Sequence, residues 1–242
     1  MTSRSRIPDL AKKYLRRVLG LSGQSWKAPG EFEALYDRAC EKCKVPVASN
    51  PKKRRRRFVG MQFLQALGEP KGAVAECGCF KGVSSYLICQ SLSQHHEIGK
   101  QQEFHIFDSF EGLSRRTQPD FVNNKNSQTE ALMSCSLEEV KDNLSEFGFI
   151  HYHKGWIPHC FRDVDENKTF SFVHIDLDLY GPVRDALNFF FPRLSCPGFI
   201  VVDDYGSRKW PGVLKAVEEF VEQQGCSCIR STVGIAVIGK LV

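Results

Sequence analysis

The stretch 73-AVAECGCFKGVSS-85 decides the fold. Ala73–Cys77 is a short apolar segment typical of a buried strand, and Val83 begins an apolar pattern typical of a helix. The loop between them carries Gly78 and Gly82, which let the backbone turn sharply and approach a ligand at the start of the helix. Their G-x-x-x-G spacing differs from the G-x-G-x-x-G of dinucleotide-binding proteins. A strand, a glycine loop and a helix in this order predict the first unit of an α/β sheet.

Strands and helices alternate along the rest of the chain. Further strands are predicted at 103–107, 149–153, 170–175, 199–202, 228–232 and 235–241, and helices at 83–95, 136–148, 185–194 and 213–224. The last two strands, separated by Gly234, indicate an antiparallel hairpin. This alternation predicts an α/β protein with a seven-stranded, mostly parallel sheet and helices on both faces. The terminal hairpin is typical of the Rossmann-like class I methyltransferase fold.

The N-terminal part of the chain has a different character. Residues 1–60 hold 16 Lys/Arg and 5 Asp/Glu, whereas the other 182 residues hold 17 Lys/Arg and 23 Asp/Glu. Helical spacing of apolar residues predicts helices at 7–20 and at 31–42, and a third helix whose first turns carry the basic run 52–57. We therefore expect a basic helical extension over 1–69, followed by the α/β domain over 70–242. Such asymmetry raises nucleic acid or a membrane surface as a partner.

Composition narrows the class of protein. The chain of 242 residues is 42% hydrophobic and 25% charged, so it can bury a large core, which excludes a mainly disordered protein. Its apolar runs fall short of the ~18–20 residues that span a bilayer, and basic residues interrupt the N-terminus, so neither a membrane span nor a secretory signal is expected. The spacing of the ten cysteines does not indicate a disulfide framework. The motif Cys40-Glu-Lys-Cys43 lacks a second pair of ligands to complete a zinc site. We therefore expect a reducing, cytoplasmic location.

Three side chains stand where ligands bind in such sheets, at the carboxyl ends of the first three strands. Glu76 begins the glycine loop, where an acid suits a cofactor that carries an ammonium group. Asp108 follows the second strand, where a carboxylate can accept hydrogen bonds from both ribose hydroxyls. Trp156 follows the third strand and can stack on an adenine. These residues favour a nucleoside-containing cofactor, a description that both NAD and S-adenosylmethionine meet.

Pairs of acids follow the next two strands. Asp176 and Asp178 come after Phe-Val-His-Ile, and Asp203 and Asp204 come after Phe-Ile-Val-Val. Carboxylates brought together repel one another unless a cation or a proton intervenes. If the two strands are neighbours, Asp176, Asp203 and Asp204 converge, and a hard, oxygen-bound ion such as Mg²⁺ explains that convergence. Exposed acids in turns are the alternative.

In these blocks the sequence resembles the macrocin O-methyltransferase family (TylF/MycF type). Its members are Mg²⁺-dependent enzymes that transfer a methyl group from S-adenosylmethionine to sugar hydroxyls of natural products. The resemblance covers residues 70 to 220. The matching stretches are ECG-x-x-x-G-x-SS at 76–85, FDSFEGL at 107–113, SLEEV at 136–140, KGW at 154–156, IDLDLY at 175–180, FPRLS at 191–195, GFIVVDDYG at 198–206 and AVEEF at 216–220. The glycine loop also looks like that of catechol O-methyltransferases.

The resemblance implies a role for each matching residue. The cofactor-binding residues would be Glu76, Gly78, Gly82 and Ser84 at the methionine end, Asp108 with Ser109 at the ribose, and Ser136 and Trp156 near the adenine. Asp176, Asp203 and Asp204 would bind Mg²⁺, and Asp176 would also be the catalytic base that takes the proton of the acceptor.

The resemblance also implies a homodimer, a glycoside acceptor and a place in antibiotic biosynthesis, with residues 1–69 covering the active site, contacting the acceptor or forming the dimer. Alternatives remain open. A small phenol is a second acceptor class. The basic run PKKRRRR at 51–57 resembles a nuclear localisation signal and raises a nucleic-acid-binding protein or RNA methyltransferase, although no aromatic-rich platform accompanies it. The helix predicted over 7–20 raises a peripheral membrane contact.

Overall fold

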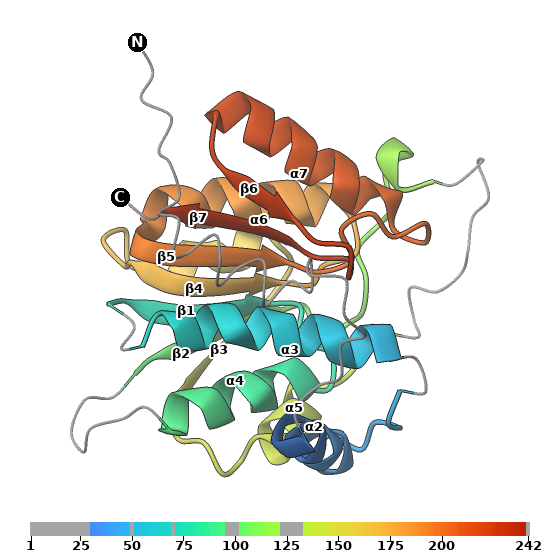
Figure 1. The fold of residues 1–242 in the computed structure, drawn as a ribbon, viewed down its shortest axis with the longest axis vertical. Helices are drawn as coiled ribbons and strands as arrows, with labels where there is room; N and C mark the ends of the chain where they lie inside the picture. Colours follow the sequence, from blue (N-terminus) through green and yellow to red (C-terminus); the bar gives the residue numbers. More distant parts are fainter. Residues whose placement is uncertain (1–29, 49–50, 69–70, 95–101, 122–132, 241–242) are drawn as a thin grey trace.

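A seven-stranded sheet runs through the centre of the molecule. The computed structural model describes residues 30–48, 51–68, 71–94, 102–121 and 133–240. The strand order is β3-β2-β1-β4-β5-β7-β6 (Figure 1). Strands β1 to β5 are parallel, and β7 pairs antiparallel with both β5 and β6. The mostly parallel sheet with an antiparallel C-terminal pair is therefore confirmed.

The elements follow the predicted order. Strands β1 to β7 span Ala73–Cys77, Phe104–Asp108, Ile150–Lys154, Phe170–Ile175, Leu194–Val202, Cys228–Arg230 and Ala236–Lys240. The helices are α2 (Gly30–Lys42), α3 (Pro51–Ala66), α4 (Val83–Gln94), α5 (Leu137–Asn143), α6 (Tyr180–Arg193) and α7 (Pro211–Gln224), with 3-10 turns η1 (Gln118–Asp120) and η3 (His159–Asp163).

Three boundaries differ from the prediction by five residues, and several others by one or two. The structure begins α6 at Tyr180 instead of 185, begins β5 at Leu194 instead of 199, and ends α5 at Asn143 instead of 148. The early start of α6 has a clear cause, because Asp120 Oδ1 accepts a hydrogen bond from the backbone N–H of Tyr180 at 2.7 Å. This carboxylate satisfies a free N–H at the helix terminus from 60 residues away in the sequence.

Alternation along the buried strands divides the core into two layers. Val74, Phe104 and Phe172 pack on the side of α2, α3 and α4, whereas Ala75 and Val173 pack on the side of α6 and α7. Helices on both faces explain why β1 and β4 are buried along their whole length. Figure 1 shows α3 and α4 against one face of the sheet.

Helices α2 and α3 contribute to the same core as the sheet. Tyr36 and Ala39 of α2, and Val59 and Phe63 of α3, are buried in it. The Phe63 ring packs edge-on against Phe199 of β5, with ring centroids 5.2 Å apart. The division predicted at residue 70 stays a prediction, and the helix predicted over 7–20 lies outside the described residues. In the part of the chain that the structure describes, no helix is both long and apolar enough to cross a membrane.

The carboxyl ends of β1 to β5 meet at one edge of the sheet, and backbone hydrogen bonds continue the ladders past them. The N–H of Gly78 donates to the carbonyl of Phe107 at 2.9 Å, and the N–H of Asp176 donates to that of Cys77 at 2.9 Å. The N–H of Asp203 donates to the carbonyl of Ile175 at 2.8 Å. The strand order reverses at β1, which lies between β2 and β4, and ligands bind at such a point in open α/β sheets.

Candidate active site

A cavity of about 430 Å³ opens at this edge of the sheet, a size common for small-molecule sites. The predicted site residues that line it are Gly78, Ser84, Asp108, Ser109, Trp156, Asp176, Asp203 and Asp204. Glu76, Gly82 and Ser136 are described by the structure but are not among its lining residues. The sheet therefore brings the predicted cofactor loop and the predicted metal ligands into one cavity.

The glycine loop comes very close to the end of β4. Gly78 has φ +82°, and a Cβ atom there would lie 2.1 Å from the carbonyl oxygen of Asp176. Only glycine fits this conformation and this approach. Gly82, with φ +94°, directly precedes α4, and its carbonyl accepts the N–H of Tyr86 at 2.8 Å. The loop thus lies directly beside the acidic segment.

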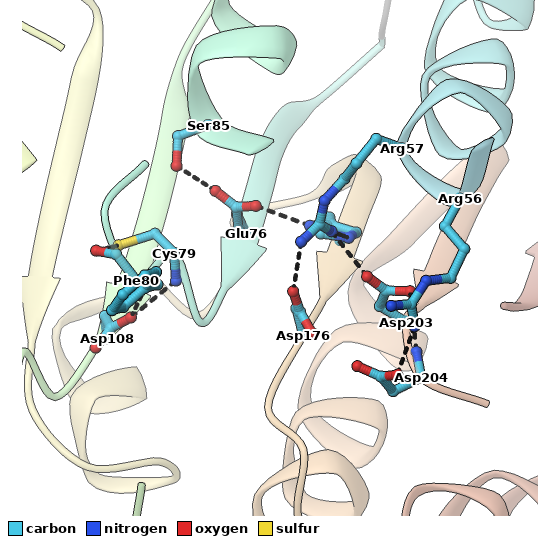
Figure 2. Close-up of polar contacts among 11 residues, drawn as sticks. Arg56, Arg57, Glu76, Cys79, Phe80, Ser85, Asp108, Asp176, Asp203 and Asp204 are labelled. Atoms are coloured by element: carbon cyan, nitrogen blue, oxygen red, sulfur yellow. Dashed lines mark hydrogen bonds and ion pairs between the residues drawn. The ribbon is translucent and has the colours of Figure 1, made fainter. Parts of the chain in front are cut away.

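Asp108 fixes the glycine loop while it lines the cavity. Its Oδ2 accepts the backbone N–H of Cys79 at 2.8 Å and that of Phe80 at 3.3 Å, as Figure 2 shows. Its Oδ1 accepts the N–H of Phe110 at 2.7 Å. Ser109 donates from Oγ to the carbonyl of Gly112 at 2.9 Å. The first two loops of the sheet are therefore held together by one carboxylate.

Glu76 does not reach the cavity. It is 0% exposed and lies on the face of β1 that packs against α3 and α4. Its Oε2 accepts a hydrogen bond from Ser85 Oγ, and its Oε1 lies 2.8 Å from His174 Nδ1. In this arrangement it serves a buried polar network. Ser136 also has a local partner, since its Oγ caps α5 by accepting the N–H of Glu139 at 3.1 Å.

Two arginines of α3 enter the acidic cluster, which the sequence analysis did not predict. Arg57 donates from Nη2 to Asp176 Oδ2 at 2.7 Å and from Nη1 to Asp203 Oδ2 at 2.9 Å (Figure 2). Arg56 Nη1 forms ion pairs with Asp203 Oδ1 at 3.1 Å and with Asp204 Oδ1. The side chains of Arg56 and Arg57 are 17% and 11% exposed, so this part of the basic run is not a solvated helix face.

His174 joins the two halves of this network. Its Nε2 lies 3.0 Å from Arg57 Nη1, and its Nδ1 contacts Glu76. A continuous chain of polar contacts therefore runs from Ser85 on α4, through Glu76 and His174, to Arg57 and the aspartates. Figure 2 labels the two ends of this chain, Ser85 with Glu76 and Arg57 with Asp176 and Asp203. It links the helix that follows the glycine loop to the acidic segments.

Arg56 and Arg57 do not compensate the negative charges of the cluster equally; the four carboxylates are those of Asp176, Asp178, Asp203 and Asp204. Burial is the largest single influence and raises the pKa of Asp176, but the attraction of Arg57, His174 and Arg56 together with the hydrogen bond from Arg57 outweighs it, and the net effect lowers that pKa. Burial together with the charge of Asp176 raises the pKa of Asp178 and that of Asp204. Both residues also have positive φ, 61° and 55°, which is strained for a residue with a side chain. Additional positive charge beside Asp178 and Asp204 would stabilise this arrangement.

The oxygens present fit a divalent cation. One carboxylate oxygen each from Asp176, Asp178 and Asp204 lie within 4.8 Å of one another. Such a set of hard oxygen ligands suits Mg²⁺. Asp178 lies in this group and Asp203 does not, since both oxygens of Asp203 face arginines, and the predicted role of Asp203 as a metal ligand stays a prediction. The sequence did contain a signal for Asp178, because two acids, Asp176 and Asp178, follow the same buried strand.

Comparison with known proteins gives a family match. The model of the Macrocin-O-methyltransferase (TylF) family matches residues 64–233, more than half of the chain. Mycinamicin III 3''-O-methyltransferase of Micromonospora griseorubida is 27% identical over 164 residues, covering 64% of this chain and 63% of the relative. A tetracenomycin rhamnosyl 4'-O-methyltransferase of Streptomyces olivaceus is 26% identical over 151 residues, covering 60% and 57%. The chain therefore spans less than two thirds of the length of these curated relatives.

Solved structures show the same fold. The O-methyltransferase NovP has a TM-score of 0.61 at 18% identity, covering 96% of this chain and 99% of that one. The calicheamicin methyltransferase CalS11 has a TM-score of 0.65 at 16% identity, covering 90% and 96%. These likenesses confirm the predicted class I methyltransferase fold.

Proposed function

Because the chain belongs to the macrocin O-methyltransferase (TylF) family, we propose that it transfers a methyl group from S-adenosylmethionine to a sugar hydroxyl of a glycoside, with Mg²⁺ as a cofactor. The observation that carries the proposal is the single cavity in which the glycine loop faces the Asp176, Asp178 and Asp204 oxygens. The names of two relatives support a sugar acceptor, since one is a mycinamicin 3''-O-methyltransferase and the other acts on a rhamnosyl group.

In the proposed reaction, one group of residues in the cavity binds the cofactor and another binds the metal ion. Gly78 and Ser84 would hold the cofactor beside Asp108, and Trp156 would stack on its adenine. Asp176, Asp178 and Asp204 would hold Mg²⁺, which when bound supplies a Lewis acid that lowers the pKa of the acceptor hydroxyl. Fixing the hydroxyl opposite the methyl group removes much of the entropic barrier of the transfer.

A carboxylate of this site must take the proton of the hydroxyl. Asp176, the base implied by the resemblance, has its Oδ2 bound to Arg57, which leaves Oδ1 to act. Asp178 lies two residues further on at the cavity wall and is the alternative base. The pH profiles of kcat of Asp176→Asn and Asp178→Asn at saturating Mg²⁺ and cofactor distinguish them, because only loss of the base removes the limb of the profile on which that base becomes protonated.

The decisive experiment measures methyl transfer from labelled S-adenosylmethionine to a panel of glycosides and catechols, with Mg²⁺ or with EDTA. We expect a glycoside to be methylated only with Mg²⁺, and Asp178→Asn and Asp204→Asn to lose this activity while calorimetry shows unchanged cofactor binding. Asp185→Asn is the control, because this half-buried carboxylate pairs with its neighbour Arg184 on α6 and does not line the cavity. Full activity of the Asp178 and Asp204 variants in EDTA would overturn the role of the metal. Methylation of catechols alone would show that the acceptor is a phenol and not a sugar.

The structure does not favour the nucleic-acid alternative. Arg54 pairs with Asp37 at 3.1 Å, and Arg56 and Arg57 pair with the aspartates of the cavity, so these three guanidinium groups are engaged within the protein. A charge that is already paired releases few counterions on binding a phosphate backbone. We expect no salt-dependent electrophoretic shift with RNA.

We also propose that the enzyme is cytoplasmic and homodimeric. All ten cysteines lie in the described part of the chain and are free, and seven of them are buried, which suits a reducing compartment. The homodimer rests on the resemblance and is tested by light scattering. A membrane contact through 7–20 is tested by liposome flotation of the full chain and of a chain without residues 1–22.

A further inference from the structure

Four side chains that can bind a metal lie on one face of β2 and β3, and none of them lines the cavity. Glu103 directly precedes β2, His105 belongs to β2, and His151 and His153 belong to β3. His105 and His151 are register partners, and alternation places Glu103 and His153 on the same face. The His105 ring stacks on those of His151 and His153, with centroids 4.8 and 5.2 Å away. A Glu-x-His segment therefore lies beside a His-x-His segment.

The ligand atoms converge at one point. One atom each from Glu103, His105 and His151 lie within 4.8 Å of one another. His105 Nε2 is 3.0 Å from Glu103 Oε2, and His105 Nδ1 is 2.9 Å from His153 Nε2. His105 is only 6% exposed, so packing holds its ring in this orientation. The neutral form of such an imidazole binds a metal.

The positively charged side chain of Lys168 lies at the edge of this cluster. Lys168, which follows η3 and precedes β4, forms an ion pair with the same Glu103 oxygen that contacts His105. The carboxylate thus has a positive partner without any metal. A divalent cation would replace the Lys168 ammonium at Glu103, which exchanges one positive charge for another and leaves no carboxylate uncompensated.

We propose that Glu103, His105 and His151 form a binding site for a transition-metal ion of the Zn²⁺ type. Two imidazoles and one carboxylate form a ligand set that suits Zn²⁺, whereas Mg²⁺ prefers oxygen ligands alone. His105 binds through Nε2 and donates its Nδ1–H to His153 Nε2, and such a hydrogen bond fixes the ring of a metal ligand. The neutral rings change tautomer and lose no proton.

The position of the site connects it to the cavity. Strands β2 and β3 end at Asp108 and Lys154, and the N–H of Gly155 donates to the carbonyl of Asp108 at 2.9 Å. An ion that joins the two strands ties the edge strand β3 to the sheet behind the loops that carry Asp108 and Trp156. Binding would therefore raise the thermal stability of the chain.

The test is calorimetric titration of Zn²⁺ into the untagged full chain, with Mg²⁺ present to occupy the carboxylate cluster. We expect His151→Asn and Glu103→Gln to lower the Zn²⁺ affinity by at least about tenfold, and His153→Asn by about 10- to 100-fold through the lost orientation of His105. His151 is exposed on an edge strand, so its replacement does not disturb the core. His159→Asn changes an exposed histidine of η3 and is the matched control.

Lys168→Met provides an independent check, because it removes the cation that competes for Glu103. It should raise the Zn²⁺ affinity and leave the stoichiometry unchanged. The absorption spectrum of bound Co²⁺ should lack a thiolate band, which separates this site from cysteine ligation. A Zn²⁺ affinity that is the same in the wild type, His151→Asn and Glu103→Gln, or that Lys168→Met lowers, would overturn the proposal.

Discussion

At the residue scale, the ion pairs of Arg56 and Arg57 offset the repulsion among the buried aspartates of the cavity. Arg57 contacts two carboxylates, and Asp203 is only 3% exposed. We predict that Arg57→Ala costs about 3–5 kcal/mol of unfolding free energy, because it leaves Asp176 without its arginine and buried Asp203 with Arg56 alone. Urea unfolding measures this loss, and added Mg²⁺ should recover part of it. Arg54→Ala is the control on the same helix, because its partners Glu33 and Asp37 are exposed, and it should cost at most about 1 kcal/mol. Equal losses would contradict the role given to Arg57.

Gly78 supports a second prediction at this scale. Gly78→Ala places a Cβ atom 2.1 Å from the carbonyl oxygen of Asp176 and at φ +82°. We expect a loss of at least about 2 kcal/mol in stability, since the backbone at the end of β4 must shift. Gly206→Ala shares the positive φ of 76° but meets nothing within 4 Å, so it separates the clash from the conformational cost. If both variants unfold at the same urea concentration, the close approach contributes nothing to stability.

At the element scale, α3 connects the core to the site. Its buried Phe63 holds the helix against Phe199 of β5, and its first turns carry Arg56 and Arg57. We predict that Phe63→Ala costs about 3–5 kcal/mol, as expected for a large buried ring. Because the arginines then lose their support, the variant should also bind Mg²⁺ with a changed affinity. Gln65→Ala, at an exposed position of the same helix, should stay within about 0.5 kcal/mol. A Phe63→Ala variant with normal unfolding and normal Mg²⁺ affinity would show that α3 docks without it.

Elements whose boundaries depend on local signals were predictable. The strands at Ala73–Cys77 and Phe170–Ile175 are apolar runs bounded by polar or turn residues, and both agree with the structure. The start of α6 was not predictable, since Asp120 from a distant loop fixes it. The same distinction applies to the site. Parallel strands bring their carboxyl ends together, which let the sequence predict the aspartates, whereas the pairing of Arg57 with Asp203 joins residues 146 positions apart. The inward orientation of Glu76 depends on the face of β1 that α3 and α4 cover, which the acid alone does not reveal.

At the scale of the whole molecule, the described part of the basic N-terminal region is bound to the acidic body by specific contacts. Lys44 of the segment after α2 pairs with Asp142 of α5 at 3.2 Å, and Arg56 and Arg57 pair with the aspartates of the cavity. Helices α2 and α3 also bury apolar side chains in the core that the sheet shares. Part of the basic charge of the N-terminal region therefore pairs with acidic residues of the same chain. These basic residues need no membrane or nucleic acid to explain them.

This packing predicts how the chain responds to shortening. A chain that begins at residue 70 loses α2 and α3, exposes the face of the sheet around Phe199 and Val201, and leaves Asp176 and Asp203 without their arginines. We expect it to aggregate or to lack a cooperative thermal transition, because both hydrophobic burial and charge compensation are lost together. A chain that begins at Gly30 keeps both helices and is the control; circular dichroism and size-exclusion chromatography compare the two. Cooperative unfolding of the chain from residue 70, at the temperature of the control, would instead show that 70–242 is an independent domain and that α2 and α3 only cover it.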